Sequence, residues 1–329
     1  MPRKSYGYAV LEAIAQEMRQ NKYMCFFYEY QSAAAVTPTG EVLDLWKEFG
    51  TPRTSGWGWP VDEAWYVGCA TGLALTGVPV VVWIPYMAMG FVFEHVNQQI
   101  SKRHYATGGV LKMPLVIRMD GASRSGSTGV THQDVGQEAM FANMAGIKIV
   151  TPSNAYDAKG LMVAAIRDPN PVIFFDYQDV AAGPQPDVPD DAYSLPIGKA
   201  VVRQQGKDLT LVSWAPATVD VAQALPEIAQ AGISVEYIDL RSIKPWDADA
   251  VFASVNKTGK LLVVEHGNYI NSFGSHILSE VAQYVPGAKV KKIAYPDAHV
   301  PAAKEMYEWM RPDAPKIVEA VKKMTGNRP

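Results

Sequence analysis

Residues 126–178 read GSTGVTHQDVGQEAMFANMAGIKIVTPSNAYDAKGLMVAAIRDPNPVIFFDYQ. A glycine-rich loop carrying His132 leads into alternating helical and apolar segments. The apolar runs of Val, Ile and Phe lack strict alternation, which is typical of strands covered on both faces. Helices between such strands imply parallel crossover connections. The stretch therefore predicts a doubly wound α/β sheet, with helices over 133–143 and 154–167 and strands over 147–151 and 171–176.

The same alternation extends in both directions along the chain. Ser5 is a candidate N-cap for a helix whose apolar face includes Val10, Ile14 and Met18, and Asp62 is one for a helix that ends near residue 75. The other predicted strands are 24–28, 79–84, 114–118, 208–214, 233–238 and 260–265, and the other predicted helices are 91–106, 216–231, 246–256 and 274–283. The fold class is α/β throughout.

A change in composition divides the chain. Residues 181–196 read AAGPQPDVPDDAYSLP, and their four prolines and acidic residues are typical of a linker. The sequence therefore predicts a first domain over 1–185, a linker over 186–198 and a second domain over 199–329.

The overall composition excludes several classes of function. The net charge is −3 and no Lys/Arg stripe is present, which argues against nucleic-acid binding. The apolar runs have the length of strands and are too short to cross a bilayer. No signal peptide opens the chain, so we expect a cytoplasmic protein. The two cysteines are too few for a disulfide framework.

These motifs together resemble a known family. Stretch 126–178, with its His132 loop, is similar to the β subunit of the thiamine-diphosphate-dependent, decarboxylating component of 2-oxo acid dehydrogenase complexes. That group includes the pyruvate, branched-chain and acetoin dehydrogenases. The similarity continues in 196–200 (PIGKA), 240–245 (LRSIKP) and 257–260 (KTGK). It implies a transketolase-like pyrimidine-binding domain followed by a transketolase C-terminal-like domain.

The resemblance assigns catalytic roles to two residues. Glu63 stands where the family has P-I-S-E, and would bond the aminopyrimidine ring of thiamine diphosphate to promote removal of its thiazolium C2 proton. His132 matches the family's H-S-Q position and would act on substrate or acyl group at the mouth of the site. Taken alone, a Glu at a helix N-terminus is ordinary dipole complementation, and a lone His is more often structural.

Further cofactor contacts are implied, with departures from the family pattern. Glu29 matches the Glu of the family's L-G-E-D-V and would help to link paired active sites, although a solvated loop residue fits as well. Ala88 stands where the family has an aromatic residue against the pyrimidine ring, and Tyr86 or Phe91 could compensate. Trp57 and Trp59 precede Glu63 and would line a larger pocket or an interface.

A potassium site is also implied by the resemblance. The family often holds potassium with backbone carbonyls, and the matching positions are Leu115, Ala165, Asp168 and Asn170. An ordinary helix end before two prolines explains the same residues.

The sequence lacks one motif that thiamine enzymes need. It has no G-D-G followed downstream by Asn-Asn, the signature that binds magnesium and the diphosphate. In the resembling family that motif belongs to an α subunit. The resemblance therefore implies an α2β2 heterotetramer in which the cofactor and its magnesium are shared, with a lipoyl acyltransferase core as a possible further partner.

Two other functions stay open. A β-like subunit could serve assembly or regulation without chemistry, which Ala88 and the altered loop after Tyr28 favour. A transketolase-like enzyme acting on another ketone is disfavoured by the missing diphosphate motif. No P-loop or G-x-G-x-x-G fingerprint supports a nucleotide-binding enzyme.

Overall fold

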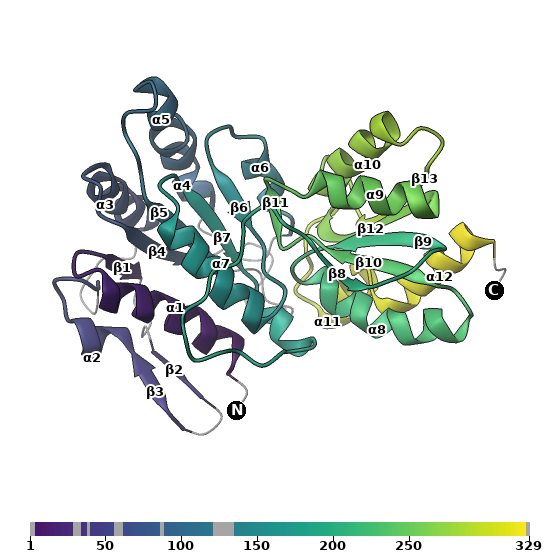
Figure 1. Cartoon of the computed structure of the whole chain (residues 1–329), viewed down its shortest axis with the longest axis horizontal. Helices are drawn as coiled ribbons and strands as arrows, with labels where there is room; N and C mark the ends of the chain where they lie inside the picture. The colour runs from purple at the N-terminus through teal and green to yellow at the C-terminus, as the bar shows by residue number, and fades with distance from the viewer. Residues whose placement is uncertain are drawn as a thin grey trace. The chain divides into compact units, whose positions relative to one another are not determined.

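The computed structural model describes residues 4–28, 34–37, 40–55, 62–85, 89–120 and 135–326. Among them the chain forms two compact units. Unit 1 comprises the described residues up to 120, together with 143–181 and 185–197. Unit 2 comprises 135–142, 182–184 and 198–326. Each unit is built on its own sheet with helices against it, which confirms the α/β fold class (Figure 1).

Unit 1 contains a parallel sheet in the order β1-β4-β5-β7-β6. Its strands are β1 (Cys25–Tyr28), β4 (Val80–Pro85), β5 (Leu115–Asp120), β6 (Lys148–Val150) and β7 (Val172–Asp176). Its helices are α1 (Tyr6–Gln20), α2 (Leu45–Phe49), α3 (Glu63–Leu75), α4 (Met89–Glu94), a π-helix (His95–Ile100), α5 (Arg103–Ala106) and α7 (Ala155–Arg167), with a 3-10 helix over Gln178–Ala182. A small antiparallel pair, β2 (Ala34–Val36) and β3 (Val42–Asp44), completes it.

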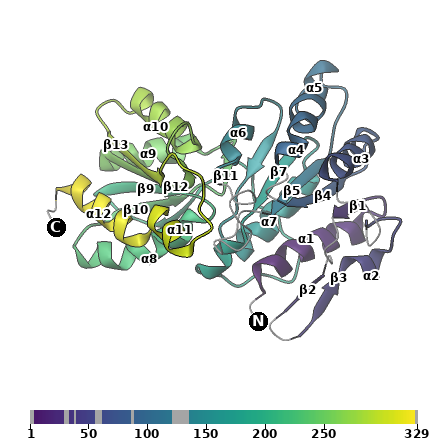
Figure 2. The ribbon, with the colours of Figure 1, turned by 180° about the vertical axis from the view of Figure 1, so that it is seen from behind.

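The strand order reverses direction within this sheet. Strands β1, β4 and β5 follow one another in one direction across the sheet, with α3 and α4 in their connections. Strand β7 follows β6 in the opposite direction, with α7 in its connection. Right-handed crossovers then place α7 on the face opposite α3. Helix α1 packs along α7, and α3 packs against β4 (Figure 2).

The proline-rich segment 185–197 is tied to α1 and α7. Lys159 is fully buried, and its ammonium donates to Glu12 at 2.7 Å and to the carbonyl of Pro189 at 2.6 Å. Leu195 N–H donates to the carbonyl of Gly160 at 3.0 Å. Tyr193 OH donates to the carbonyl of residue 156 at 2.7 Å. These bonds hold segment 185–197 against α1 and α7 in unit 1, and we call this segment the strap.

Unit 2 contains a mixed sheet in the order β13-β12-β9-β10-β8, in which only the β8–β10 pairing is antiparallel. The strands of this sheet are β8 (Val201–Gln204), β9 (Leu209–Ser213), β10 (Val235–Asp239), β12 (Lys260–Asn268) and β13 (Lys289–Tyr295), and the short strand β11 (Ser242–Lys244) is not part of it. Its helices are α6 (Glu138–Ala142), α8 (Ala217–Gln230), α9 (Ala248–Thr258), α10 (Phe273–Tyr284), α11 (Lys304–Met310) and α12 (Ala314–Thr325).

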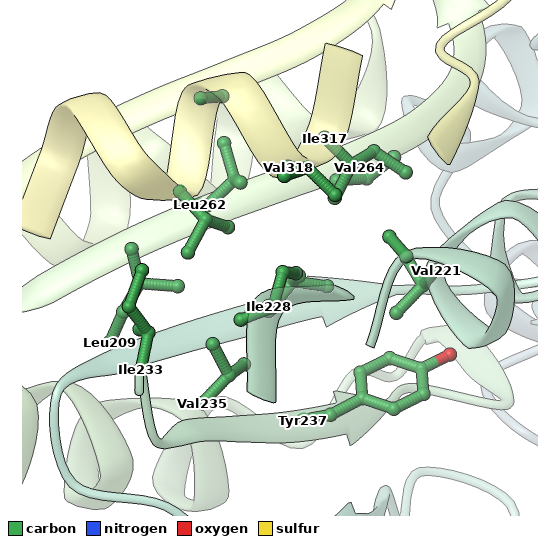
Figure 3. Packing of buried hydrophobic residues seen from close by; sticks show 14 of the residues in the cluster. Leu209, Val221, Ile228, Ile233, Val235, Tyr237, Leu262, Val264, Ile317 and Val318 are labelled. Carbon is green, nitrogen blue, oxygen red and sulfur yellow. The ribbon is translucent and has the colours of Figure 1, made fainter. Parts of the chain in front are cut away.

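Helices α8 and α12 form the main core of unit 2 with this sheet. Val221 and Ile228 of α8 and Ile317 of α12 pack on Leu262 and Val264 of β12, all with 1% exposure or less (Figure 3). Burial of such side chains contributes about 1.5–3 kcal/mol each. This core fixes β12, whose carboxyl end carries polar residues described below.

Most predicted elements are confirmed. The Ser5 hydroxyl accepts from Tyr8 N–H at 3.2 Å, and Asp62 caps α3 by accepting from Trp65 N–H at 3.0 Å. The prediction of one helix over 91–106 was wrong, because a π-helical segment and a turn divide it. The predicted 133–143 helix is α6 over Glu138–Ala142 in its described part.

Candidate active site

Glu63 is the first residue of α3 and sits beside the capping Asp62. It is buried, with 9% exposure, and its carboxylate has no hydrogen-bond or ion-pair partner among the described residues. A helix N-terminus favours a negative charge, but burial without a direct partner costs free energy. The role of this carboxylate as a cofactor ligand stays a prediction.

The carboxyl ends of the parallel strands form one edge of the unit 1 sheet. Tyr28 ends β1 and is fixed there by Ser55, whose hydroxyl accepts from Tyr28 N–H at 2.6 Å and donates to its carbonyl at 2.8 Å. Pro85 ends β4 and Asp120 ends β5. In open α/β sheets, ligands bind outside this edge, where the strand order reverses.

Several predicted site residues follow these strand ends directly in the sequence. Glu29 follows β1, Tyr86 and Ala88 follow β4, and His132 lies in the connection after β5. All four lie outside the described residues, as do Trp57 and Trp59. Their roles stay predictions.

Phe91 is the one predicted aromatic contact that the structure describes. It lies in α4 and is 68% exposed. Single exposed aromatic residues are common on protein surfaces, so the contact of Phe91 with the pyrimidine ring stays a prediction.

The four predicted potassium ligands lie where α7 ends and β5 and β7 begin. Met113 N–H donates to the carbonyl of Pro169 at 2.9 Å, and Leu115 N–H donates to that of Met113 at 2.8 Å, which joins the two segments. Ala165 accepts from Asp168 N–H at 3.3 Å. The Asn170 side-chain oxygen is buried without a hydrogen-bond partner among the described residues.

The charge at this position is already balanced. The Asp168 carboxylate accepts from Asn170 N–H at 3.0 Å and pairs with the Lys148 ammonium. A cation here would thus be held by neutral oxygens, with the Asn170 amide as the available ligand. No group of three or more His, Cys, Asp or Glu side chains suited to a metal occurs in the part of the chain that the structure describes.

Sequence reasoning missed a buried ion pair at the carboxyl ends of β5 and β7. Arg118 donates through Nε to Asp176 at 2.6 Å, and its guanidinium lies 4.9 Å from the Trp83 ring centre. Asp176 is fully buried, and one of its oxygens has no hydrogen-bond partner among described residues. A charge inside an apolar strand shows in the sequence that a partner is needed, but not which distant residue supplies it.

A second missed cluster surrounds the carboxyl end of β12 in unit 2. Glu265 accepts from the Ser272 hydroxyl and from Gly274 N–H at 3.0 Å, and Lys292 Nζ lies 3.4 Å away. Burial raises the pKa of Glu265 to about 7, although the hydrogen bonds and Lys292 oppose the shift. Glu138 of α6 adds a raising charge and accepts from the indole of Trp214 at 3.1 Å.

The next residue of β12 belongs to a separate network. His266 lies 2.8 Å from the fully buried Asp220 of α8, and Arg311 lies 3.0 Å from the other Asp220 oxygen. The His266 ring meets Tyr295 edge to face at 5.4 Å. Val135 packs against the cluster formed by Tyr295, Val300, Tyr307 and Met310, so the chain that follows His132 in the sequence is anchored in unit 2.

Comparison with known proteins bears on both units. The family described as "Transketolase, pyrimidine binding domain" matches residues 5–178, and "Transketolase, C-terminal domain" matches residues 198–317. A solved structure titled "Split gene transketolase, inactive beta4 tetramer" covers 99% of this chain and 100% of its own, with a TM-score of 0.81 and 20% identity. That likeness concerns the fold.

Curated relatives are more similar in sequence. The pyruvate dehydrogenase E1 component subunit beta of Rhizobium meliloti is 36% identical over 95% of this chain and 68% of its own length. The protein of the same name in Bacillus subtilis is 31% identical over 96% and 97%. The acetoin:2,6-dichlorophenolindophenol oxidoreductase subunit beta of Bacillus subtilis is 32% identical over 87% and 84%. The chain therefore belongs to the family of E1 component β subunits, which join a transketolase pyrimidine-binding domain to a transketolase C-terminal domain.

Proposed function

We propose that this chain is the β subunit of a thiamine-diphosphate-dependent 2-oxo acid dehydrogenase or acetoin dehydrogenase. Relatives that are named as pyruvate and acetoin dehydrogenase β subunits match this chain over most of their length. The observation in the structure that carries the proposal is Glu63, a buried carboxylate without a described partner at the start of α3.

The buried carboxylate of Glu63 has the chemistry that the pyrimidine half of this cofactor needs. Thiamine diphosphate, when bound, supplies a nucleophilic carbon at C2 of its thiazolium ring. Glu63 would hold a proton between its carboxylate and the ring nitrogen of the aminopyrimidine. Tyr86, Ala88 and Phe91 would lie against the pyrimidine ring, and Glu29 would connect to the second active site of the assembly.

His132 would act later, on the substrate or the acyl group. It lies in the connection after β5, and Val135 anchors the end of that connection in unit 2. A histidine can donate a proton near neutral pH, as acyl transfer requires.

The remaining half of the site would come from an α subunit. This chain lacks the G-D-G and Asn-Asn motif, so the α subunit would hold the diphosphate and magnesium in an α2β2 heterotetramer. A lipoyl acyltransferase core would receive the acyl group. We place the assembly in the cytoplasm, with domains at 1–185 and 199–329 and a linker at 186–198. None of the helices in the described ranges is long and apolar enough to cross a membrane.

We also propose that potassium binds beside Leu115, Ala165, Asp168 and Asn170. Support comes from the unpartnered Asn170 amide oxygen. The ion would stabilise the turn between α7 and β7.

An activity panel on the assembled enzyme tests the proposed function. The chain is co-expressed with its α subunit, and the reduction of 2,6-dichlorophenolindophenol is followed with pyruvate, branched-chain 2-oxo acids and acetoin. We expect reduction that requires added thiamine diphosphate and magnesium. Because Ala88 replaces an aromatic ring and Trp57 and Trp59 precede Glu63, we expect a larger or more apolar substrate to exceed pyruvate in kcat/KM. A loaded heterotetramer that turns over none of these substrates would contradict the proposal.

A further inference from the structure

The chain turns between the end of β12 and the start of α10 over residues 269–272. Tyr269 and Ile270 lie on this turn and are each 58% exposed. Asn271 has a φ of 53°, in the left-handed region, which costs free energy for a residue other than glycine. The turn therefore depends on contacts that hold it closed.

Lys292 of β13 supplies most of these contacts, although it is only 7% exposed. Its ammonium donates to the carbonyl of Tyr269 at 2.6 Å, to the Ser272 hydroxyl at 2.8 Å and to the Ser275 hydroxyl at 2.6 Å. It also lies 4.8 Å from the centre of the Tyr269 ring. An ammonium has three donors, so all of them are used by oxygens of the turn and of the first turn of α10.

Glu265 of β12 contacts the same segment and is 2% exposed. Its carboxyl accepts from the Ser272 hydroxyl and from Gly274 N–H at 3.0 Å. A Cβ atom on Gly274 would lie 2.9 Å from Glu265 Cδ, so the carboxyl and the start of α10 are in close contact. Lys292 Nζ lies 3.4 Å away, but its hydrogens point to other oxygens. Ionised Glu265 is therefore attracted by Lys292 without a direct hydrogen bond to it.

Burial is the main influence on the charge of Glu265. It raises the pKa of this carboxyl to about 7, ahead of the opposing hydrogen bonds and of Lys292. Glu138 of α6 is the other charged group that acts on it, and its carboxylate also raises the pKa. The adjacent His266 side chain instead lies 2.8 Å from Asp220. While the turn is closed, the ionised form of Glu265 is thus the costly one.

Opening of the turn removes this cost. Once Ser272 and Gly274 move away, water reaches Glu265, whose pKa returns toward its ordinary value of 4.5. The closed form thus binds the proton more tightly than the open form does. Opening is least favourable below about pH 4.5, becomes easier as the pH rises, and reaches its limit above about pH 7.

We propose that residues 269–275 form a pH-sensitive latch on unit 2, which the buried side chains of Glu265 and Lys292 hold closed and which opens more readily when Glu265 is ionised. Lys292 keeps its three hydrogen bonds in both charge states of Glu265. The carboxyl therefore sets the response to pH, and the ammonium sets the strength of closure. Opening moves the exposed Tyr269 and Ile270, so the surface at this end of β12 changes with pH.

Amide hydrogen exchange on the full-length chain, followed by mass spectrometry, tests the latch. The amides of Gly274 and Ser275 report on it, because they donate to Glu265 and to the carbonyl of Ser272. After correction for the intrinsic exchange rate, we expect their opening to increase by about tenfold or more between pH 5 and pH 8, with a limit of about seventyfold. They should exchange faster than the amides of the buried strand β9, which open only with the whole of unit 2.

Three variants separate the two parts of the latch. Glu265→Gln keeps the size of the side chain and should remove the dependence on pH, whereas the exposed Glu305→Gln should keep it. Ser275→Ala removes one of the three Lys292 bonds. It should increase opening about fivefold at every pH and leave the dependence on pH unchanged.

The wild-type profile decides the proposal even where a variant does not fold. Opening that stays constant or falls between pH 5 and pH 8 would overturn it, as would exchange of the latch amides at the rate of β9. A dependence on pH that Glu265→Gln leaves intact would also overturn it. Enzyme activity does not enter the readout, so failure here is distinct from failure of the proposed function.

Discussion

At the scale of single residues, Glu63 is set apart by its position in the fold. Asp62 takes the role of helix cap, so Glu63 is not needed to satisfy the first N–H groups of α3. It is nevertheless buried, which a carboxylate rarely is without a partner. We therefore expect a ligand to supply the partner that the described residues do not.

Replacement of Glu63 by Gln tests its chemical role. The variant should fold and assemble, because the side-chain shape is kept, but it should lose the ability to move a proton on the pyrimidine ring. We expect exchange of the cofactor's C2 proton to slow by roughly a thousandfold, or about 4 kcal/mol of barrier. Hydrogen–deuterium exchange followed by NMR on the assembled enzyme measures this rate.

The neighbouring substitution Asp62→Asn provides the control. It neutralises an adjacent carboxylate, and Asn is as good a helix cap as Asp. Exchange should stay close to the wild-type rate in this variant. Wild-type exchange in Glu63→Gln would refute the assigned role.

His132 should act after the cofactor is activated. His132→Ala is expected to keep C2-proton exchange and to lower kcat for the overall reaction by about 10²–10⁴-fold, the usual contribution of a general acid or base. Rapid-quench exchange and steady-state assays on the same preparation separate the two steps. A parallel loss of proton exchange would place His132 at the cofactor instead.

The Asp62 cap could be predicted because a helix start leaves a local pattern, and the structure confirms it. Glu63 was singled out by the family resemblance, because its local pattern alone fits ordinary dipole complementation. Sequence reasoning missed Arg118 and Asp176, whose pairing joins residues 58 positions apart on neighbouring strands. It also missed Glu265 and Lys292, because their burial depends on helix α10 closing over the end of β12. Contacts between distant segments are not recorded in local sequence patterns.

At the scale of elements, the strap over 185–197 depends on a small residue in α7. A Cβ atom on Gly160 would lie 2.6 Å from Leu195 Cγ and 2.8 Å from the Tyr193 ring. Gly160 also accepts the Leu195 N–H bond. The helix and the strap therefore approach each other too closely for any side chain at this position.

Gly160→Ala should destabilise the chain in spite of the higher helix propensity of Ala. We expect a loss of about 1–3 kcal/mol in the free energy of unfolding, as for an overpacked core. Gly7→Ala in α1 is the matched control, since a Cβ there meets nothing within 4 Å, and should gain about 0.5–1 kcal/mol. Urea unfolding followed by circular dichroism compares both with the wild type. A stabilised Gly160→Ala variant would show that the strap is not packed as described.

Glu265 should make the stability of unit 2 depend on pH. Its folded pKa of about 7 exceeds its ordinary value of 4.5 because burial penalises the charged form. The folded state then binds the proton more tightly than the unfolded state. This contribution is fully present below about pH 4.5, falls as the pH rises, and is lost above about pH 7.

Glu265→Gln should remove this dependence. The change in unfolding free energy between pH 5 and pH 8 should shrink by up to about 3 kcal/mol relative to the wild type. Denaturant titrations at several pH values measure it, with the exposed Glu305→Gln as control. An unchanged pH profile in Glu265→Gln would show that Glu265 ionises normally in the folded state.

The predicted order of elements was largely correct because the apolar strands and capped helices have strong local patterns. The antiparallel β8, the edge strand β13 and the helices α11 and α12 were not predicted. Strand β13 reads KVKKIAY, and its three lysines interrupt any apolar run. The sequence over 91–106 gave no sign of the π-helical segment His95–Ile100, which contacts α3.

At the scale of the whole molecule, the two units carry the pyrimidine-binding and C-terminal domains of the family. What the sequence lacks is as informative as what it contains. Glu63 is the proposed carboxylate of the pyrimidine side, and the sequence has no G-D-G and Asn-Asn motif for a diphosphate with magnesium. Under the proposed function, a complete site requires a second chain.

Isothermal titration calorimetry of thiamine diphosphate, in the presence of magnesium, tests this claim most directly. It is run on the isolated chain and on the chain co-purified with its α subunit, at equal protein concentration. We predict no measurable binding to the isolated chain and saturable binding by the heterotetramer. Micromolar binding to the isolated chain would contradict the account, because it would show that this chain holds the diphosphate by itself.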